Sequence, residues 1–387
     1  MKAPRWRNTW LTSRTDPHTA PARLARAGVV LLALAGGTPA HAARHAPPPS
    51  APPALRYGLP AACLTHVIAA PLLTNSGSPI IPATFNDMAG LAYVSVTQDE
   101  VGVYAPTPAA FPVLSAISIQ TIAGVDTTYT TVLHELRITN GRAGDVPALL
   151  EGTVQPRLND QPVLGVIGYD ILGNYDVLFD FPARVMVLFL ASTAAGCPPL
   201  QDWLGPDSMA LPLQPDRLGH LTGISMQAGT RSTRMEIEPG ADMSSLSRKD
   251  ARALGLTPAI LHDDIHVRTN AGKILNGRRH HFDNIAIGAW HDLPLDVNVE
   301  KTSYSVLGMN FLRRRRVLMA FPQGMMYMTP QADMPNDHGQ AAHGMLTTRT
   351  AIARLIDAPP TPPAPGEPMQ ATPDQAAHPA PQADRKQ

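Results

Sequence analysis

Histidine and aspartate gather twice in the second half of the chain, at His262-Asp263-Asp264-Ile265-His266 and at His280-His281-Phe282-Asp283. Imidazole and carboxylate groups are common metal ligands. Successive side chains of a strand point to opposite faces, however, so the four ligands of the first group cannot converge on one ion. We therefore predict polar surface segments at both places, with neither a metal site nor a cofactor.

Part of the sequence is repeated, and this repeat indicates which elements would position a site. The segments 166–172 and 177–182 return 140 residues later as 306–312 and 317–322. The positions that match are Val166/Val306, Gly168/Gly308, Leu172/Leu312, Val177/Val317, Leu178/Leu318, Phe181/Phe321, Pro182/Pro322 and Met186/Met326. A repeat this long corresponds to a whole lobe and far exceeds the periods of solenoid proteins. We predict two similar lobes with a site at their shared interface.

Within the lobes the hydrophobic pattern is that of strands. Residues 224–228 and 234–237 alternate on either side of Gly229-Thr230, which predicts a hairpin. In lobe one, residues 66–73 and 79–85 flank a turn at 75–78. The clearest helix is 248–254, which ends at Gly255. Short strands with frequent Gly and Pro turns predict an all-β fold of barrels or sandwiches.

The first 42 residues have the features of an export signal. Arg23 and Arg26 precede the apolar run 27–35, and Ala40-His41-Ala42 fits a small-x-small cleavage site. The apolar run is much shorter than the ~20 residues of a spanning helix. We therefore predict a periplasmic or secreted protein without stable membrane insertion.

The chain has two cysteines, Cys63 and Cys197, near the start and the end of lobe one. In an oxidising compartment such a pair is expected to form a disulfide. Two separate buried thiols are the alternative.

Composition divides the rest of the chain. Many of the 40 prolines lie near its ends, which predicts a Pro-rich linker at 43–60 and a disordered Pro/Ala-rich tail at 331–387. Lobe 1 is then 61–198 and lobe 2 is 199–330. A net charge of zero argues against a nucleic-acid partner. We expect the single basic run, 313–316, to be a solvated loop or helix end, and the protein to be a monomer.

Glu238-Pro239-Gly240-Ala241, followed by Leu246-Ser247 and by a helix ending in Leu254-Gly255-Leu256, resembles the active-site turn of retropepsin-like aspartic proteases. The family pattern is Asp-Thr/Ser-Gly-Ala, a hydrophobic-Ser pair, and a short helix ending in Leu-Gly-Leu. The repeated Gly-x-Asp/Asn-x-Leu segment resembles its second signature. Over roughly residues 61–330, the resemblance implies two retropepsin-like acid-protease barrel lobes related by pseudo-two-fold symmetry.

The resemblance also implies an aspartic-type endopeptidase, in which one carboxylate from each lobe shares a proton and activates a water. In lobe two Glu238 holds the Asp position. Glu238 is nine positions after the hairpin glycine Gly229, and Asn86 is nine positions after Gly77. Asn86 then holds the catalytic position of lobe one, whereas a shift by one residue would place Asp87 there. The family's flaps, hairpins that close over a bound peptide, would have their tips at Gly124 and Gly272.

These departures from the family pattern have chemical consequences. Asn cannot act as a base, and the extra methylene of Glu moves its oxygens by a distance that can cost about 10²-fold in rate. The sequence therefore predicts an exported aspartic-peptidase-like protein whose activity is altered or lost. If it is active, Glu238 and Asp87 would polarise the water. The alternatives are a non-catalytic protein that binds an extended peptide or protein segment, and a structural protein of the cell envelope.

Overall fold

The computed structural model describes residues 55–74, 77–105, 111–152, 155–158, 160–271 and 273–332. The predicted signal peptide, most of the Pro-rich linker and nearly all of the predicted tail lie outside these residues. Within the described part, no helix combines the length and apolarity needed to cross a membrane.

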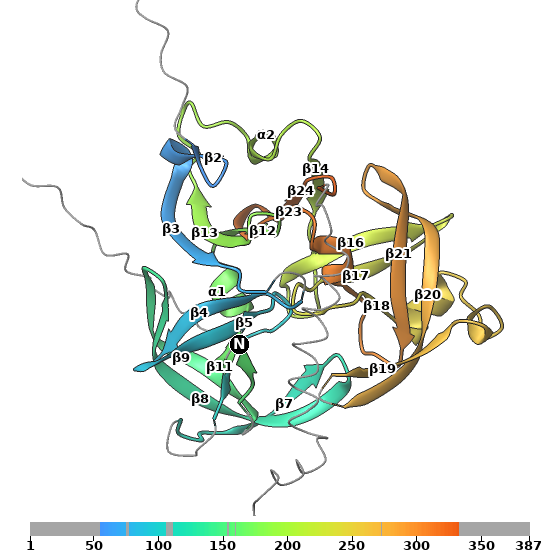
Figure 1. The fold of residues 1–387 in the computed structure, drawn as a ribbon, viewed down its shortest axis with the longest axis horizontal. Coiled ribbons are helices and arrows are strands. Elements are labelled where there is room, and N and C mark those ends of the chain that lie inside the picture. Colours follow the sequence, from blue (N-terminus) through green and yellow to red (C-terminus); the bar gives the residue numbers. More distant parts are fainter. Residues whose placement is uncertain are drawn as a thin grey trace, which may run out of the picture.

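The described residues are mostly strands, arranged as two lobes joined by a shared sheet (Figure 1). The sheet of lobe 1 holds β4 (Ile80–Phe85), β5 (Met88–Val94), β6 (Val101–Tyr104), β7 (Ala116–Thr121), β8 (Gly124–Ile138), β9 (Gly141–Gly152), β10 (Arg157–Leu158) and β11 (Gln161–Ile167). The sheet of lobe 2 holds β15 (Gln214–Pro215), β16 (Leu221–Ala228), β17 (Arg231–Ile237), β18 (Ser245–Ser247), β19 (Ile265–Asn270), β20 (Ile274–Ile287), β21 (Trp290–Glu300) and β22 (Val306–Leu307).

Each of these sheets closes on itself. In lobe 1 the order β11-β5-β4-β8-β9-β6 is completed by pairing of β6 with β11. In lobe 2 the order β16-β17-β22-β18-β21-β20 is completed by pairing of β16 with β20. Corresponding strands therefore occupy corresponding places in two closed barrels, and the predicted all-β fold with two barrel lobes is confirmed. Closure leaves no free edge on the strands that form the ring.

A third sheet of six strands joins the lobes, in the order β14-β24-β23-β12-β13-β3. Its strands are β3 (Leu64–Pro71), β12 (Asp176–Asp180), β13 (Val185–Ala191), β14 (Met209–Pro212), β23 (Arg316–Ala320) and β24 (Met325–Met328). At its centre β12 pairs antiparallel with β23, which is its own copy in the repeat, and Leu178 lies opposite Leu318. The pseudo-two-fold axis predicted from the repeat therefore passes between these two leucines.

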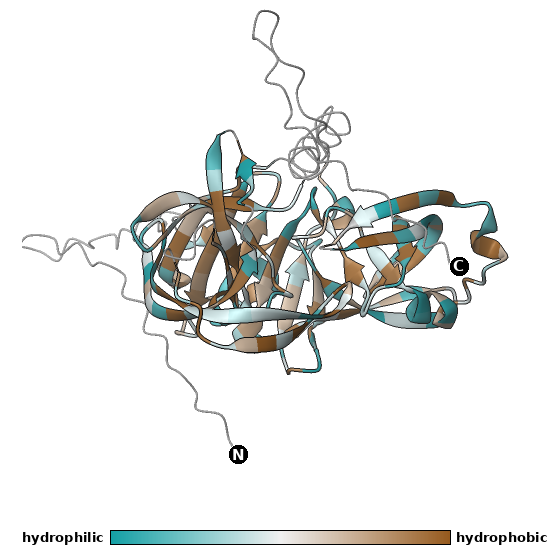
Figure 2. Cartoon of the chain, turned by 90° about the horizontal axis from the view of Figure 1, so that it is seen from below, coloured by the Kyte–Doolittle hydropathy of each residue, from teal (hydrophilic) through white to brown (hydrophobic). Residues whose placement is uncertain are grey.

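Alternate residues of the central sheet enter two different cores. Val177, Phe179 and Met319 belong to the core that runs into the barrels, whereas Leu178 and Leu318 face a second core on the outer side. Trp203 of helix α2 (Leu200–Trp203) and Leu59 cover that outer side (Figure 1). Figure 2 shows the hydrophobic segments running mainly along the strands. Because both faces of the sheet are buried, its strands are nearly continuous apolar runs.

The remaining elements are short. They comprise the β1 (Leu55–Arg56) and β2 (Leu59–Pro60) pair, the helices α1 (Tyr169–Leu172), α3 (Arg248–Ala253) and α4 (Met309–Leu312), and the 3-10 turns η1 (Ala61–Cys63), η2 (Ile260–His262) and η3 (Phe321–Gln323). The predicted helix at 248–254 is α3, and Ser247 caps it by accepting from the Asp250 N–H. The β1–β2 pair lies within the predicted linker, and it is ordered because Leu59 is buried.

The basic run 313–316 follows the end of α4, as predicted, but it is not a solvated cluster, and that part of the prediction was wrong. Arg315 is buried, with its guanidinium 4.8 Å from the ring centroid of Trp290 and 4.5 Å from that of Phe311. It donates to the carbonyls of Phe311 and Thr329, and burial lowers the pKa of Arg315 to about 10. A planar guanidinium can stack on rings and donate at its edge, which makes its burial tolerable.

Cys63 and Cys197 are joined in a disulfide, as predicted, with their Cα atoms 5.6 Å apart. The bond ties the start of β3 to the segment that leads into α2, across a loop of 134 residues. In the chain-entropy description, closing a loop of this length greatly reduces the conformational entropy of the unfolded chain.

We predict that Cys63→Ala/Cys197→Ala lowers the free energy of unfolding by about 2–4 kcal/mol, because the unfolded chain regains its loop entropy. Urea denaturation of the oxidised protein and the double variant measures this difference. Reduction with dithiothreitol should destabilise the parent protein alone. Equal stability of the two proteins would contradict the prediction.

Candidate functional site

Glu238 lies at the interface between the lobes, where β17 ends. Its backbone N–H donates to Leu307 O at 3.0 Å, continuing the parallel pairing of β17 with β22. The side chain is 7% exposed. The predicted position of Glu238 at the end of a strand and in the shared interface is therefore the position that it has in the structure.

Ser95 occupies the corresponding position in lobe 1. It follows β5, and its N–H donates to Ile167 O at 3.1 Å, as the N–H of Glu238 does to Leu307 O in lobe 2. β5 pairs in parallel with β11 as β17 pairs with β22, and Ile167 and Leu307 are related by the repeat. The Ser95 hydroxyl lies 2.8 Å from Glu238 Oε2.

Asn86 and Asp87 are therefore not at the interface, and the predicted register of lobe one was wrong. Both form the turn between β4 and β5, which corresponds to the Gly229-Thr230 turn between β16 and β17. Asn86 has φ +53° and Gly229 has φ +59°, so the asparagine adopts the left-handed conformation for which glycine is more usual. The Asn86 side chain accepts from the Glu135 N–H at 3.1 Å, which holds the turn against β8.

The carboxylate of Glu238 is surrounded by donors. Oε2 accepts from the hydroxyl of Ser95, from the N–H of Thr97 at 3.1 Å and from the Thr97 hydroxyl, while Oε1 accepts from the N–H of Gly240. A carboxylate has about four lone-pair sites. Three of the four donors reach Oε2 and one reaches Oε1, so most of the acceptor capacity of Glu238 is used by the protein itself.

Burial raises the pKa of Glu238 above its ordinary value, and the donors from Thr97, Ser95 and Gly240 oppose that shift. Desolvation is the larger effect, because a buried charge loses its hydration. The two-carboxylate mechanism needs a second acid to share the proton. Ser95 stands where that acid would be, so the pair contains one titratable carboxyl group.

A cavity of about 380 Å³ opens beside Glu238 and is lined from both lobes. Ser78, Tyr93 and Ser95 come from lobe 1, and Asp242 and Tyr304 come from lobe 2. Ser78 also links the lobes directly, since its hydroxyl donates to Gly240 O at 2.5 Å and its N–H donates to Asp242 Oδ1 at 3.2 Å. This volume lies within the range of small-ligand sites.

Two hairpins contribute to the cavity from opposite lobes. Ile122, in the β7–β8 turn, and Ala271, in the β19–β20 turn, both line it. The turns also contact each other, because Lys273 Nζ lies 3.3 Å from Asp126 Oδ2. Gly124, with φ +126°, is the first residue of β8, directly after the first of these turns, and its predicted part in substrate binding stays a prediction. Gly272 lies outside the described residues.

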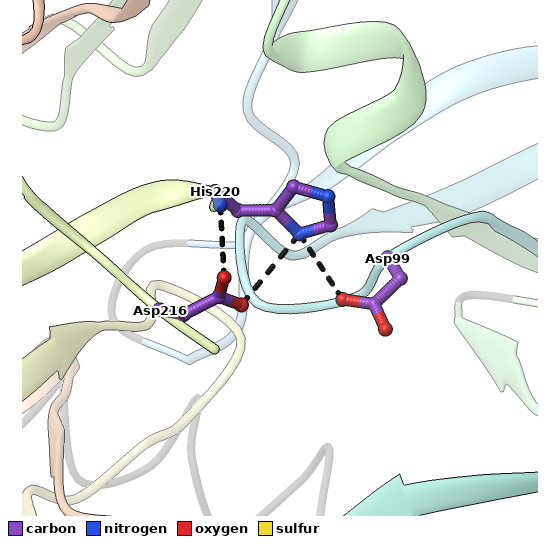
Figure 3. Close-up of side chains that lie close together, drawn as sticks. All are labelled: Asp99, Asp216 and His220. Atoms are coloured by element: carbon purple, nitrogen blue, oxygen red, sulfur yellow. Dashed lines mark hydrogen bonds and ion pairs between the residues drawn. The ribbon is translucent and has the colours of Figure 1, made fainter. Parts of the chain in front are cut away.

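A second contact between the lobes involves Asp99, Asp216 and His220 (Figure 3). His220 Nδ1 lies 3.3 Å from Asp99 Oδ1 of lobe 1 and 3.6 Å from Asp216 Oδ2 of lobe 2. The imidazole stacks on Tyr169 with ring centroids 4.3 Å apart. The hydrogen bond with Asp99 raises the pKa of His220, with a further contribution from Asp216. A protonated His220 thus links the lobes through an ion pair.

By geometry these three residues could also hold a cation, since their ligating atoms lie within 4.8 Å of one another. The His262 and His280 groups were predicted to be polar segments, and they contribute to no such set among the described residues. His262 lies 2.8 Å from Asp263 at the surface, and His280 lies 2.8 Å from Asp264. Nothing further in the site requires a metal.

Comparison with known proteins bears on lobe 2 first. Residues 224–314 match the family described as gag-polyprotein putative aspartyl protease. This stretch resembles a retropepsin-like aspartic protease. No curated protein matches the chain. Among solved structures, an aspartic proteinase from Irpex lacteus is similar with a TM-score of 0.43 and 10% identity, covering 70% of this chain and 99% of that chain.

The sequence analysis missed Ser95 and Thr97. The strand that precedes them carries the signal. Leu91-Ala92-Tyr93-Val94 corresponds to Arg234-Met235-Glu236-Ile237, because these two segments pair with β11 and β22, which are copies of each other in the repeat. Counting back from Val94 reaches a turn at Asn86-Asp87, a pair that favours tight turns. The prediction instead matched Gly77 with the hairpin glycine Gly229, and this gave the wrong register.

We predict that the stability of the parent protein declines as the pH rises from 4.5 through the raised pKa of Glu238, because the fold disfavours the charged form. Glu238→Gln should flatten this decline. Part of it should remain, since burial also raises the pKa of Asp170 to about 7. Thermal unfolding at pH 4 to 8 measures both profiles. Asp87→Asn, at an exposed carboxyl in the β4–β5 turn, is the control and should leave the profile unchanged.

The ion pair of His220 should make the free energy of unfolding depend on pH in the range where His220 titrates. Its folded pKa is raised, so its ion-pair stabilisation is complete below pH 6.5 and is lost as the pH rises through the folded value. We predict that His220→Gln lowers the free energy of unfolding by about 0.5–1 kcal/mol more at pH 5.5 than at pH 9, where only the stacking on Tyr169 is lost. His134→Gln, at an exposed pair with Asp145, should change little at either pH. An equal loss at both pH values would contradict the assignment.

Proposed function

We propose that this protein binds extended peptide segments in the cavity between its lobes and does not cleave them. The observation that carries the proposal is the contact of Ser95 with Glu238, which replaces a pair of carboxylates by a hydroxyl and a carboxylate. Hydrolysis by the aspartic mechanism requires a carboxylate that can accept a proton from water. Ser95, Thr97 and Gly240 already engage both oxygens of Glu238, with three of the four donors on Oε2, and lobe 1 supplies no second carboxylate at this position.

The strand arrangement supports an extended ligand. Among the described strands, β7 pairs with β8 alone and β19 with β20 alone, so each hairpin beside the cavity has an outer strand at the end of its sheet. An extended peptide can add to such an edge through main-chain hydrogen bonds. Tyr93, Tyr304 and Leu275 in the cavity wall would then contact its side chains.

We also propose that the protein acts in the periplasm or outside the cell. The disulfide between Cys63 and Cys197 supports an oxidising compartment. The region with signal-peptide features, residues 1–42, supports export.

The cleavage part of the proposal is tested with a library of extended peptides at pH 3 to 8. We expect no cleavage by the parent protein, and we expect cleavage to appear in Ser95→Asp/Glu238→Asp, which restores one carboxylate per lobe. Cleavage by the parent protein that disappears in a folded Glu238→Gln variant would overturn the proposal.

The binding part needs a variant in the cavity and a matched one outside it. Ile122→Asp places a charge in the cavity wall, and Val125→Asp places it on the same hairpin at a side chain that is 69% exposed. We expect peptides selected by the parent protein to bind Ile122→Asp at least about tenfold more weakly, because a buried unpaired charge is costly. They should bind Val125→Asp as they bind the parent. Equal affinities for both variants would place the peptide elsewhere.

A further inference from the structure

A second cavity, of about 520 Å³, lies in lobe 2 on the face of the sheet turned away from the inter-lobe cavity. Strand β21 shows the relation, because Asn298 and Glu300 line the inter-lobe cavity and Val299, between them, lines the second one. Successive residues of a strand point to opposite faces. One wall is formed by α3 and the segment that follows it, and the other by the base of the β19–β20 hairpin.

The floor of this cavity is apolar. Ala251, Leu256 and Val299 are buried at its base, and Pro258 and Leu261 complete it. A concave apolar surface that remains open to solvent is a typical feature of sites for apolar groups. The floor therefore favours an aliphatic or aromatic portion of a ligand.

The rim is basic. Arg248, Arg252, Arg278, His262 and His266 line the cavity, and the described residues around it include no Asp or Glu. Arg248 and Arg252 are four residues apart on α3, where side chains are neighbours and like charges repel. Neither forms an ion pair within the described part of the chain.

The acids close to this rim in sequence are engaged elsewhere. Asp250 accepts from the hydroxyls of Ser247 at 2.7 Å and Ser305 at 2.6 Å, on the inner side of α3. Asp264 lies 2.8 Å from His280, and Asp263 lies at the surface beside His262. Asp263 thus pairs with His262 of the rim, whereas Arg248 and Arg252 have no carboxylate partner within the described residues.

We propose that this cavity binds an amphipathic monoanion, a carboxylate carried on a medium-length aliphatic chain. The chain would cover Leu256 and Leu261, and the carboxylate would lie between Arg248 and Arg252, where a guanidinium can donate two parallel hydrogen bonds. A bare inorganic anion would leave the floor uncovered, and an alcohol would leave the arginines unpaired.

The proposed site has a structural consequence for the inter-lobe cavity. Its wall at His266 and Arg278 is the base of the β19–β20 hairpin, and the turn of that hairpin lines the inter-lobe cavity at Ala271. A ligand held between α3 and this base would therefore fix the hairpin relative to the barrel. Binding of the carboxylate does not depend on the peptide-binding proposal, because the two cavities lie on opposite faces of the sheet.

The test is calorimetric titration of the full mature chain with decanoate, decanol and acetate. We expect decanoate to bind at least about tenfold more tightly than decanol or acetate, since each of these lacks one of the two interactions. Absence of decanoate binding, or equal binding of decanol, would overturn the proposal.

Variants of α3 locate the site. Arg248→Gln/Arg252→Gln should weaken decanoate binding by about tenfold or more. Lys249→Gln removes a neighbouring charge of the same helix that does not line the cavity, and it should change the affinity less than twofold, as ~0.4 kcal/mol would. Arg248, Lys249 and Arg252 are all exposed, and circular dichroism verifies the fold of each variant. Equal weakening by the two variants would indicate general electrostatic attraction and would overturn the assignment.

Discussion

The pairing of β12 with β23 is the contact on which the rest of this molecule depends. Each strand is the repeat of the other, and their antiparallel register places Leu178 opposite Leu318. Antiparallel pairing of a strand with its own copy relates the two lobes that contain these strands by a pseudo-two-fold axis. The barrels, the helices α1 and α4, and the turns that follow β5 and β17 are placed by that relation. Because alternate residues of both strands enter separate cores, a slip by one residue would move each side chain into the core that does not fit it.

The same symmetry brings the ends of β5 and β17 together, and there the two copies differ in chemistry. Lobe 2 supplies a buried carboxylate, and lobe 1 supplies the hydroxyl and N–H donors that surround it. Burial alone would make Glu238 costly, since a desolvated charge without a partner is strongly destabilising. Donation by Ser95 and Thr97 offsets part of that cost, which explains why one acid is tolerated at the axis without a second. The interaction also joins the lobes, together with the bonds of Ser78 to Gly240 and Asp242.

Charge is distributed unevenly in lobe 2 although the whole chain is neutral. Arg315 is buried against aromatic rings and backbone carbonyls, and Arg316 lies 3.0 Å from Asp180 across the central sheet. Arg248 and Arg252, by contrast, face an apolar hollow with no such partner among the described residues. Net charge therefore says little about local recognition here. The position of each guanidinium relative to rings, carbonyls and carboxylates decides whether it stabilises the fold or remains available to a ligand.

The sequence alone determined the repeat, the β-rich lobes, the β16–β17 hairpin, the α3 helix and the placement of Glu238 at the end of a strand, because these features depend on alternation and turn residues within short segments. Pairing of Cys63 with Cys197 followed from their number and the predicted compartment. The partner of Glu238 was decided only by tertiary structure. Asn86, and not Gly77, is the counterpart of the hairpin glycine Gly229, so local signals did not fix the register of β4 and β5. Parallel pairing of β5 with β11, about 70 residues away in the chain, places Ser95 at the site, and no local pattern encodes such a contact.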